Sequence, residues 1–291
     1  MTSEPRSGRW AAGVLSQQQP DGTWPGGFHG LAIPGKRALT TEQALRRLHA
    51  LGFTGADEPV RRCLQTMTAC LRGERKIDAY WEKGIDWAMY EPLMLGAWIR
   101  LFDPEQPDAL AFARRWARVA EAGFSGGSYD AAAWNAAYEA EFHRAARHPR
   151  PLGFSAMYHT MLLPGLLSPA AETALVEHVL HTGMYYVHER PLTPPPASFQ
   201  SRETSRWLAA LSLLTAYPAA REALAFAKAW LYLHARPDGT WDMSAACADR
   251  VYLPLADSWR NEAVRRADCT CRIRSFLSYF ITHQEPTGPA R

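Results

Sequence analysis

Apolar residues recur at helical spacing along almost the whole chain, and this periodicity constrains the fold more than any other feature of the sequence. No stretch combines sustained alternation with β-branched residues, as a strand would. One helix is expected over 41–52, where Thr40 and Gln43 form a capping-box pattern and Leu45 and Leu48 share a face. The periodicity therefore predicts an all-α fold.

The expected helices are of two kinds, which alternate along the chain. Amphipathic outer helices with one charged face are expected at 57–72, 105–122, 170–183 and 219–234. Inner helices that are apolar on nearly all sides are expected at 85–101, 154–167 and 201–217. This alternation predicts about five or six stacked antiparallel pairs, in an open solenoid or a closed ring. We expect one domain over 9–283, between flexible ends at 1–8 and 284–291.

A short repeat supports this architecture. The sequence Pro-Asp-Gly-Thr-Trp stands at 20–24 and again at 237–241, each time after an expected outer helix. Pro-Asp-Gly favours a turn in which Gly supplies a positive backbone φ, and a Trp is suited to covering the end of the preceding helix. We therefore expect Trp24 and Trp241 to be structural.

The Gln-rich turn at 16–24, which ends in Gly-x-Trp, resembles the QW motif of squalene–hopene cyclases and of the related protein prenyltransferases. The resemblance implies a single α/α toroid around a central cavity lined by aromatic residues. It also implies an apolar, isoprenoid-like substrate. The same turn occurs in α/α-toroid polysaccharide lyases and hydrolases, so it identifies a fold more closely than a reaction.

The chain departs from both families at their catalytic motifs. The Asp-x-Asp-Asp motif with which class II cyclases protonate their substrate is absent from the sequence. Prenyltransferases bind zinc through Asp, Cys and His, with Asp and Cys two positions apart, whereas Asp268 lies one and three positions from Cys269 and Cys271. We therefore expect neither a metal nor another cofactor.

Polar residues at the starts of inner helices are the first candidates for a site, because the loops that enter these helices would line the mouth of the cavity. Asp86 and Glu91 lie among many aromatic residues, and each is a candidate general acid or base if an apolar wall raises its pKa. The alternative is that they cap a helix near Pro92. The candidate substrate-binding residues of this segment are Trp81, Trp87 and Tyr90.

Glu203 and Arg206 open the most apolar helix, where charged groups are costly unless they are paired. Either the two pair with each other, or Glu203 is catalytic and Arg206 holds an anionic group of the substrate. His159 is the lone titratable group of another apolar helix. It is a candidate for proton transfer, with a satisfied core histidine as the alternative.

Asp268 and Arg272 would join Asp257 and Arg260 at one end of the ring. These residues either form a salt-bridge network that closes the last helix pair onto the first, or supply a catalytic Asp268 and a substrate-binding Arg272. A common active site requires Asp86, His159, Glu203 and Asp268 to converge around one opening.

We therefore expect a terpenoid-cyclase-like protein that acts on or binds an apolar small molecule, because aromatic faces stabilise developing cations. The aromatic wall would comprise Trp81, Trp87, Tyr90, Trp98, Trp134, Tyr138, Trp207 and Trp259. One alternative is a non-catalytic toroid that binds a ligand or a protein. The other is a carbohydrate-active hydrolase or lyase with paired carboxylates.

The composition argues against two classes of partner. Lys and Arg exceed Asp and Glu by only 32 to 29, without runs of like charge, so nucleic acid is not expected. The longest nearly uncharged apolar stretch, 207–217, is far shorter than the roughly 20 residues of a membrane span.

We expect a cytoplasmic protein for two reasons. The number of cysteines, five, is odd, and the polar start of the chain lacks the apolar run of a secretory signal.

Overall fold

The computed structural model describes residues 5–30, 38–77, 86–144 and 153–281, and the regular secondary structure in these ranges is helical. The helices in chain order are α1 (Arg9–Leu15), α2 (Thr41–Ala50), α3 (Glu58–Leu71), α4 (Trp87–Phe102), α5 (Pro107–Phe124), α6 (Ala131–Phe142), α8 (Ala156–Leu162), α9 (Pro169–Thr182), α10 (Arg202–Leu214), α11 (Ala220–Ala223), α12 (Ala225–Leu233), the short 3₁₀ helix η1 (Ala245–Cys247) and α13 (Glu262–Ser278). These ranges contain no strand, only an isolated bridge between Met184 and His188. The all-α prediction is confirmed.

Two helix starts illustrate why the sequence folds in this way. Thr40 accepts a hydrogen bond from the backbone N–H of Gln43, and the Gln43 side chain accepts one from the N–H of Thr40, which completes the expected capping box. Ser168 caps α9 through the N–H of Ala171, with Pro169 as the first helical residue. Among the described helices, none is both long enough and apolar enough to cross a bilayer.

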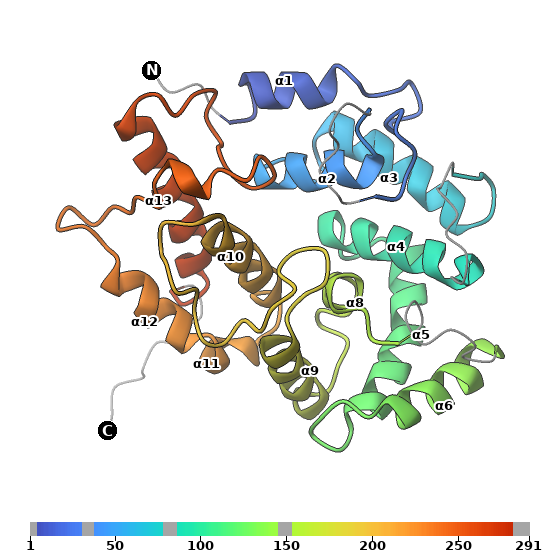
Figure 1. The fold of residues 1–291 in the computed structure, drawn as a ribbon. Coiled ribbons are helices and arrows are strands. Elements are labelled where there is room, and N and C mark those ends of the chain that lie inside the picture. The colour runs from blue at the N-terminus through green and yellow to red at the C-terminus, as the bar shows by residue number, and fades with distance from the viewer. Residues whose placement is uncertain (1–4, 31–37, 78–85, 145–152, 282–291) are drawn as a thin grey trace, which may run out of the picture.

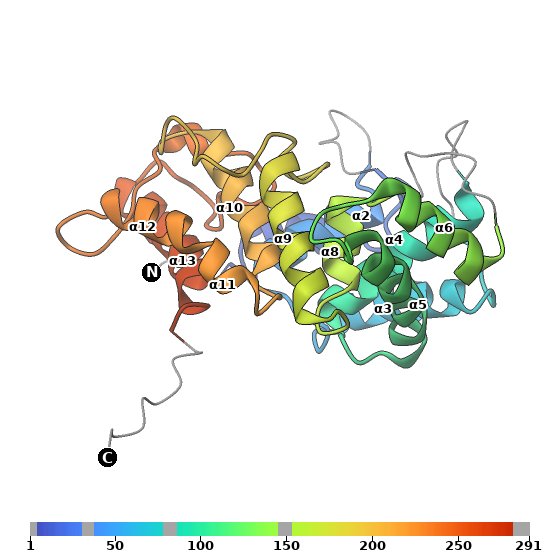
Figure 2. The ribbon, with the colours of Figure 1, turned by 90° about the horizontal axis from the view of Figure 1, so that it is seen from below.

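Helices α2, α4, α8, α10 and α13 lie toward the middle of the molecule, and the remaining α-helices lie outside them (Figure 1). Helix α4 packs on α3, α5 and α8, and α10 packs on α8 and α13. Seen from below, α12 lies at one end of the molecule, next to α13, and α5 and α6 lie at the other (Figure 2). The closed α/α toroid stays a prediction, as does the single domain over 9–283.

The first helix is in contact with the segment that precedes the last one. The backbone N–H of Arg9 donates to Oδ1 of Asp257 at 2.6 Å, and the indole N–H of Trp10 donates to the carbonyl of Ala256 at 3.0 Å. The segment 248–257, which leads toward α13, is thereby joined to α1.

Both copies of the repeated turn make the same hydrogen bonds between helices. The indole N–H donates to a carbonyl of the preceding outer helix, from Trp24 to Val14 at 2.8 Å and from Trp241 to Leu231 at 2.7 Å. The backbone N–H of each Trp donates to a threonine hydroxyl on an inner helix, at 3.1 and 3.0 Å. These threonines are Thr41 on α2 and Thr270 on α13. Each turn therefore fixes an outer helix to an inner one.

The aspartate of the repeat holds the turn itself. Oδ1 of Asp21 accepts hydrogen bonds from the N–H and the hydroxyl of Thr23, and Asp238 does the same for Thr240. Gly22, which follows Asp21, has a φ of +86°, a backbone conformation that favours glycine. The repeated sequence therefore corresponds to a repeated structure.

Replacing Trp24 or Trp241 by Ala should lower the free energy of unfolding by about 3–5 kcal/mol, the range for emptying a buried aromatic site. Both Trp side chains are buried, and each substitution also removes the hydrogen bond from the indole to the preceding helix. Urea denaturation measures the change, with Leu233→Ala, whose residue is 82% exposed, as the control. A cost below about 1 kcal/mol for both Trp variants would show that the turns do not hold the helices together.

Candidate functional site

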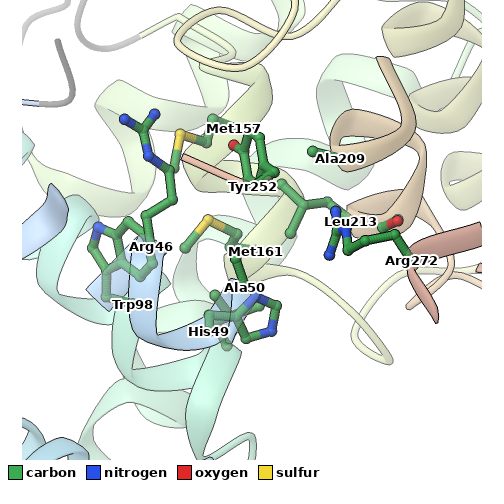
Figure 3. Close-up of a pocket in the computed structure, with 12 residues that line it drawn as sticks. Arg46, His49, Ala50, Trp98, Met157, Met161, Ala209, Leu213, Tyr252 and Arg272 are labelled. Carbon is green, nitrogen blue, oxygen red and sulfur yellow. The ribbon is translucent and has the colours of Figure 1, made fainter. Parts of the chain in front are cut away.

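A cavity of about 470 Å³ lies between the inner helices, and its walls are mostly apolar (Figure 3). Helices α2, α4, α8, α10 and α13 all contribute to its lining. The larger apolar side chains that line it are Trp98, Leu101, Met157, Met161 and Leu213. A concave site with mostly apolar walls and a few polar groups is typical of small-molecule binding.

Polar groups border this central cavity at its rim. They are Arg46, His49, Ser212, Tyr252 and Arg272. The Tyr252 ring lies between the two guanidiniums, with its centroid 5.9 Å from Cζ of Arg46 and 5.7 Å from Cζ of Arg272. Figure 3 shows Arg46 and Trp98 on one side of the cavity and Leu213 and Arg272 on the other. No Asp or Glu stands among the described residues of the lining, whereas two guanidiniums, those of Arg46 and Arg272, do.

Arg272 is available to a ligand. It lines the cavity and contacts the face of Tyr252, and no hydrogen bond or ion pair is found for its guanidinium among the described residues. The neighbouring His49 is exposed to solvent, but many protein atoms surround its ring and displace part of its hydration. This loss of hydration, together with the charge of Arg272, lowers the pKa of His49 to about 4. The imidazole is therefore neutral at pH 7.

The loop that carries Tyr252 is held by a buried aspartate. Oδ1 of Asp249 accepts hydrogen bonds from the backbone N–H groups of Val251, Tyr252 and Leu253 at 2.8–3.2 Å, and Oδ2 accepts one from Ser205 of α10 at 2.9 Å. Because these bonds satisfy the carboxylate locally, Asp249 positions Tyr252 and does not itself line the cavity.

On the other side of Trp98 lies a fully buried carboxylate, that of Glu42 on α2. One oxygen accepts hydrogen bonds from the Trp98 indole N–H at 2.7 Å and from the Tyr158 hydroxyl at 2.8 Å. The other lies 2.7 Å from Nδ1 of His29 and accepts the N–H of Gly30 at 3.1 Å. Burial, followed by the charge of Glu42, raises the pKa of Tyr158, so the phenol keeps its proton and donates.

The sequence contains a signal for Glu42, which was not among the predicted site residues. Glu42, Leu45 and Leu48 are spaced three apart, so the carboxylate shares the apolar face of α2 and must be buried with it. The sequence around Arg46 and Tyr252 shows no comparable pattern that would have marked them as residues of the cavity.

The residues predicted around Asp86 are divided between the surface and the core. Asp86 precedes α4 and pairs with Arg144 at 2.9 Å, and burial raises the pKa of the half-buried Glu91. Trp87 and Tyr90 are buried, and both rings pack edge-on against His29 at the Glu42 network. Trp81 lies outside the described residues.

At the start of α10, Glu203 lies 3.6 Å from Arg190 and 3.7 Å from His188, whereas Arg206 is exposed. The two do not form the pair that their spacing allowed. Trp207 is buried toward the outer helix α12, where it packs on Trp230, and its indole donates to the carbonyl of Leu192.

His159 is fully buried among the rings of Trp116, Trp134 and Phe154, with centroids at 4.6–5.5 Å. Its Nδ1 accepts the N–H of Ser155 at 2.9 Å. Burial lowers its pKa to about 3. This geometry is that of a neutral core histidine.

Asp268 holds a loop. Its Oδ2 accepts hydrogen bonds from the N–H groups of Leu255 and Ala256, both at 2.8 Å, and from the indole of Trp259 at 2.6 Å. Asp86, His159, Glu203 and Asp268 thus have separate sets of partners, and among the described residues none of the four lines the central cavity. Of the residues predicted for the site and its aromatic wall, Arg272 and Trp98 do line it.

The described residues contain no group of three or more His, Cys, Asp or Glu side chains arranged to hold a metal ion. Cys269 is buried and Cys271 is exposed, so the two do not face one common site. Comparison with known protein families, curated proteins and solved structures finds no match to this chain.

Glu42→Gln should lower the free energy of unfolding by about 3 kcal/mol or more. The NH₂ group of the new side chain would face N–H or O–H groups that are themselves hydrogen-bond donors. Urea denaturation at pH 7 measures it. Glu203→Gln, at a side chain that is 38% exposed, is the matched control and should change stability by less than about 0.5 kcal/mol. Equal effects of the two substitutions would contradict the role assigned to Glu42.

His159 should make stability depend on pH on the acid side. Its folded pKa of about 3 lies below the roughly 6.5 of an unfolded histidine, so the unfolded state binds more protons between these pH values. Stability is therefore lost as the pH falls from about 6.5 toward 3. The expected contribution is up to about 1.4 kcal/mol per pH unit.

His159→Asn keeps an acceptor for Ser155 and should remove this contribution, which urea denaturation across the pH range measures. His181→Asn, on the exposed end of α9, should keep the native curve. An unchanged slope in His159→Asn would show that the buried imidazole is protonated in the folded state.

Proposed function

We propose that the protein binds an apolar, isoprenoid-like small molecule with one anionic end in the central cavity. The observation that carries this proposal is Arg272, a guanidinium that lines a mostly apolar cavity and makes no hydrogen bond or ion pair among the described residues. Arginine is suited to carboxylate and phosphate groups because its planar fork donates two parallel hydrogen bonds.

The walls support an apolar body for the ligand. Trp98, Met157, Met161 and Leu213 offer a large aromatic face and flexible or branched aliphatic surfaces. Methionine adapts to irregular shapes because its side chain is unbranched and polarisable. The QW-type turns add the resemblance to proteins that handle isoprenoids.

The lining favours binding over acid–base chemistry by carboxylates. A glycoside hydrolase needs two carboxyl groups flanking the scissile bond, and a class II cyclase needs an acidic proton donor at the substrate. The described lining holds neither, because its titratable residues are Arg46, His49, Tyr252 and Arg272. We therefore favour the ligand-binding function over the cyclase-like and carbohydrate-active alternatives.

Isothermal titration calorimetry with farnesoic acid and farnesol tests this proposal, since the two share one isoprenoid chain and differ in charge. The acid should bind about tenfold or more tightly than the alcohol, because a hydrogen bond to a charged group contributes about 1.5–3 kcal/mol. Arg272→Met should remove most of that difference while the alcohol keeps its affinity.

Arg274→Met is the control, because Arg274 is an exposed residue of the same helix whose guanidinium donates to the carbonyl of Gly239. It should bind both compounds as the native protein does. No binding of either compound, or equal affinities that Arg272→Met leaves unchanged, would overturn the proposal.

A further inference from the structure

A second cavity, of about 420 Å³, adjoins the central one. Both are lined by Leu101, Met161 and Leu213, so these three side chains stand between them. None of the three carries a hydrogen-bonding group that a passing hydrocarbon chain would have to displace. Met161 and Leu213 are aliphatic, and the Met side chain is flexible, so the partition between the two cavities consists of side chains that can change rotamer.

The second cavity contains a buried hydroxyl that lacks a partner. Thr160 of α8 is 1% exposed and lines this cavity, and its Oγ1 makes no hydrogen bond among the described residues. A threonine within a helix commonly bonds the carbonyl four residues earlier, and this one does not. The Thr160 carbonyl, by contrast, accepts a hydrogen bond from the Tyr217 hydroxyl at 2.9 Å. Because buried polar groups are nearly always satisfied, an oxygen of a ligand in this cavity would supply the partner that the hydroxyl lacks.

The second cavity is also lined by an arginine, Arg100, whose guanidinium already donates to three backbone carbonyls. Nε of Arg100 donates to the carbonyl of Leu162 at 3.0 Å, and its two terminal nitrogens donate to the carbonyls of Pro104 and Pro164. This guanidinium fixes the loops that follow α4 and α8. Thr160 therefore offers a neutral polar group in the second cavity, whereas Arg272 offers a guanidinium in the central one.

We propose that the ligand is an elongated chain that passes Met161 into the second cavity, with an anion at the Arg272 end and a neutral oxygen at the Thr160 end. The chemical class is a long-chain acid with a hydroxyl or carbonyl group near its far end. This inference rests on the proposed binding in the central cavity and deepens it, since it adds the second polar group and the path between the two cavities.

The test compares ω-hydroxy acids with the corresponding unsubstituted acids of 10, 12 and 16 carbons by isothermal titration calorimetry. At one chain length or more, the native protein should bind the hydroxy acid about fivefold more tightly, the gain expected from one satisfied buried hydroxyl. Thr160→Val, which keeps the shape of the side chain, should abolish this preference and leave the affinity for the unsubstituted acid unchanged or higher. Thr160→Ser should retain the preference.

The outcomes separate the two proposals. If both series bind with equal affinity and Thr160→Val changes nothing, the far polar contact is refuted while binding in the central cavity stands. If neither these acids nor farnesoic acid binds, the proposed function fails as well.

Met161→Trp gives a second measurement that does not depend on Thr160. A larger side chain between the cavities should lower the affinity for the 16-carbon acid more than the affinity for the 10-carbon acid. Equal weakening of both would contradict the path past Met161.

Discussion

The hydrogen bonds of Glu42 are the interaction on which the geometry of the cavity depends. A carboxylate without solvent contact keeps its place only if its lone pairs are satisfied, and here three separate segments supply the partners: the loop at His29 and Gly30, helix α4 and helix α8. Helix α2 itself carries Glu42. The network therefore fixes α2, α4 and α8 against one another, and the same three helices contribute Arg46, Trp98 and Met161 to the cavity wall.

The opposite wall of the cavity is held mainly by hydrogen bonds between side chains and the backbone of the segment 248–257. Asp249 and Asp268 accept backbone N–H groups of the 248–257 segment, and Arg47 of α2 donates to the carbonyl of Val251 at 3.0 Å. This segment carries Tyr252. The turn at Trp241 adds a contact to Thr270 on α13, two residues before Arg272. The wall that carries Tyr252 and Arg272 is therefore held by hydrogen bonds within the segment 248–257 and by long-range hydrogen bonds from α1, α2 and α10.

The fold was predictable from the sequence to the extent that local chemistry decides it. Periodicity and caps such as Thr40 and Ser168 indicated the helices and their starts, and the shared Pro-Asp-Gly-Thr-Trp sequence indicated two equivalent turns. The candidate site was predicted less well. Periodicity shows that His159 and Trp207 are buried, but it does not show against which neighbours, and both face outer elements rather than the cavity. Tyr252 lies in a loop, whose path depends on partners far away in the sequence.

A crystal structure of the protein with farnesoic acid tests the central claim most directly. The account predicts electron density for the chain along Trp98, Met157 and Met161, with the carboxylate within hydrogen-bonding distance of Arg272 and the Glu42 network unchanged. Density for the acid on the outer surface alone, or a carboxylate that points away from Arg272, would contradict the account.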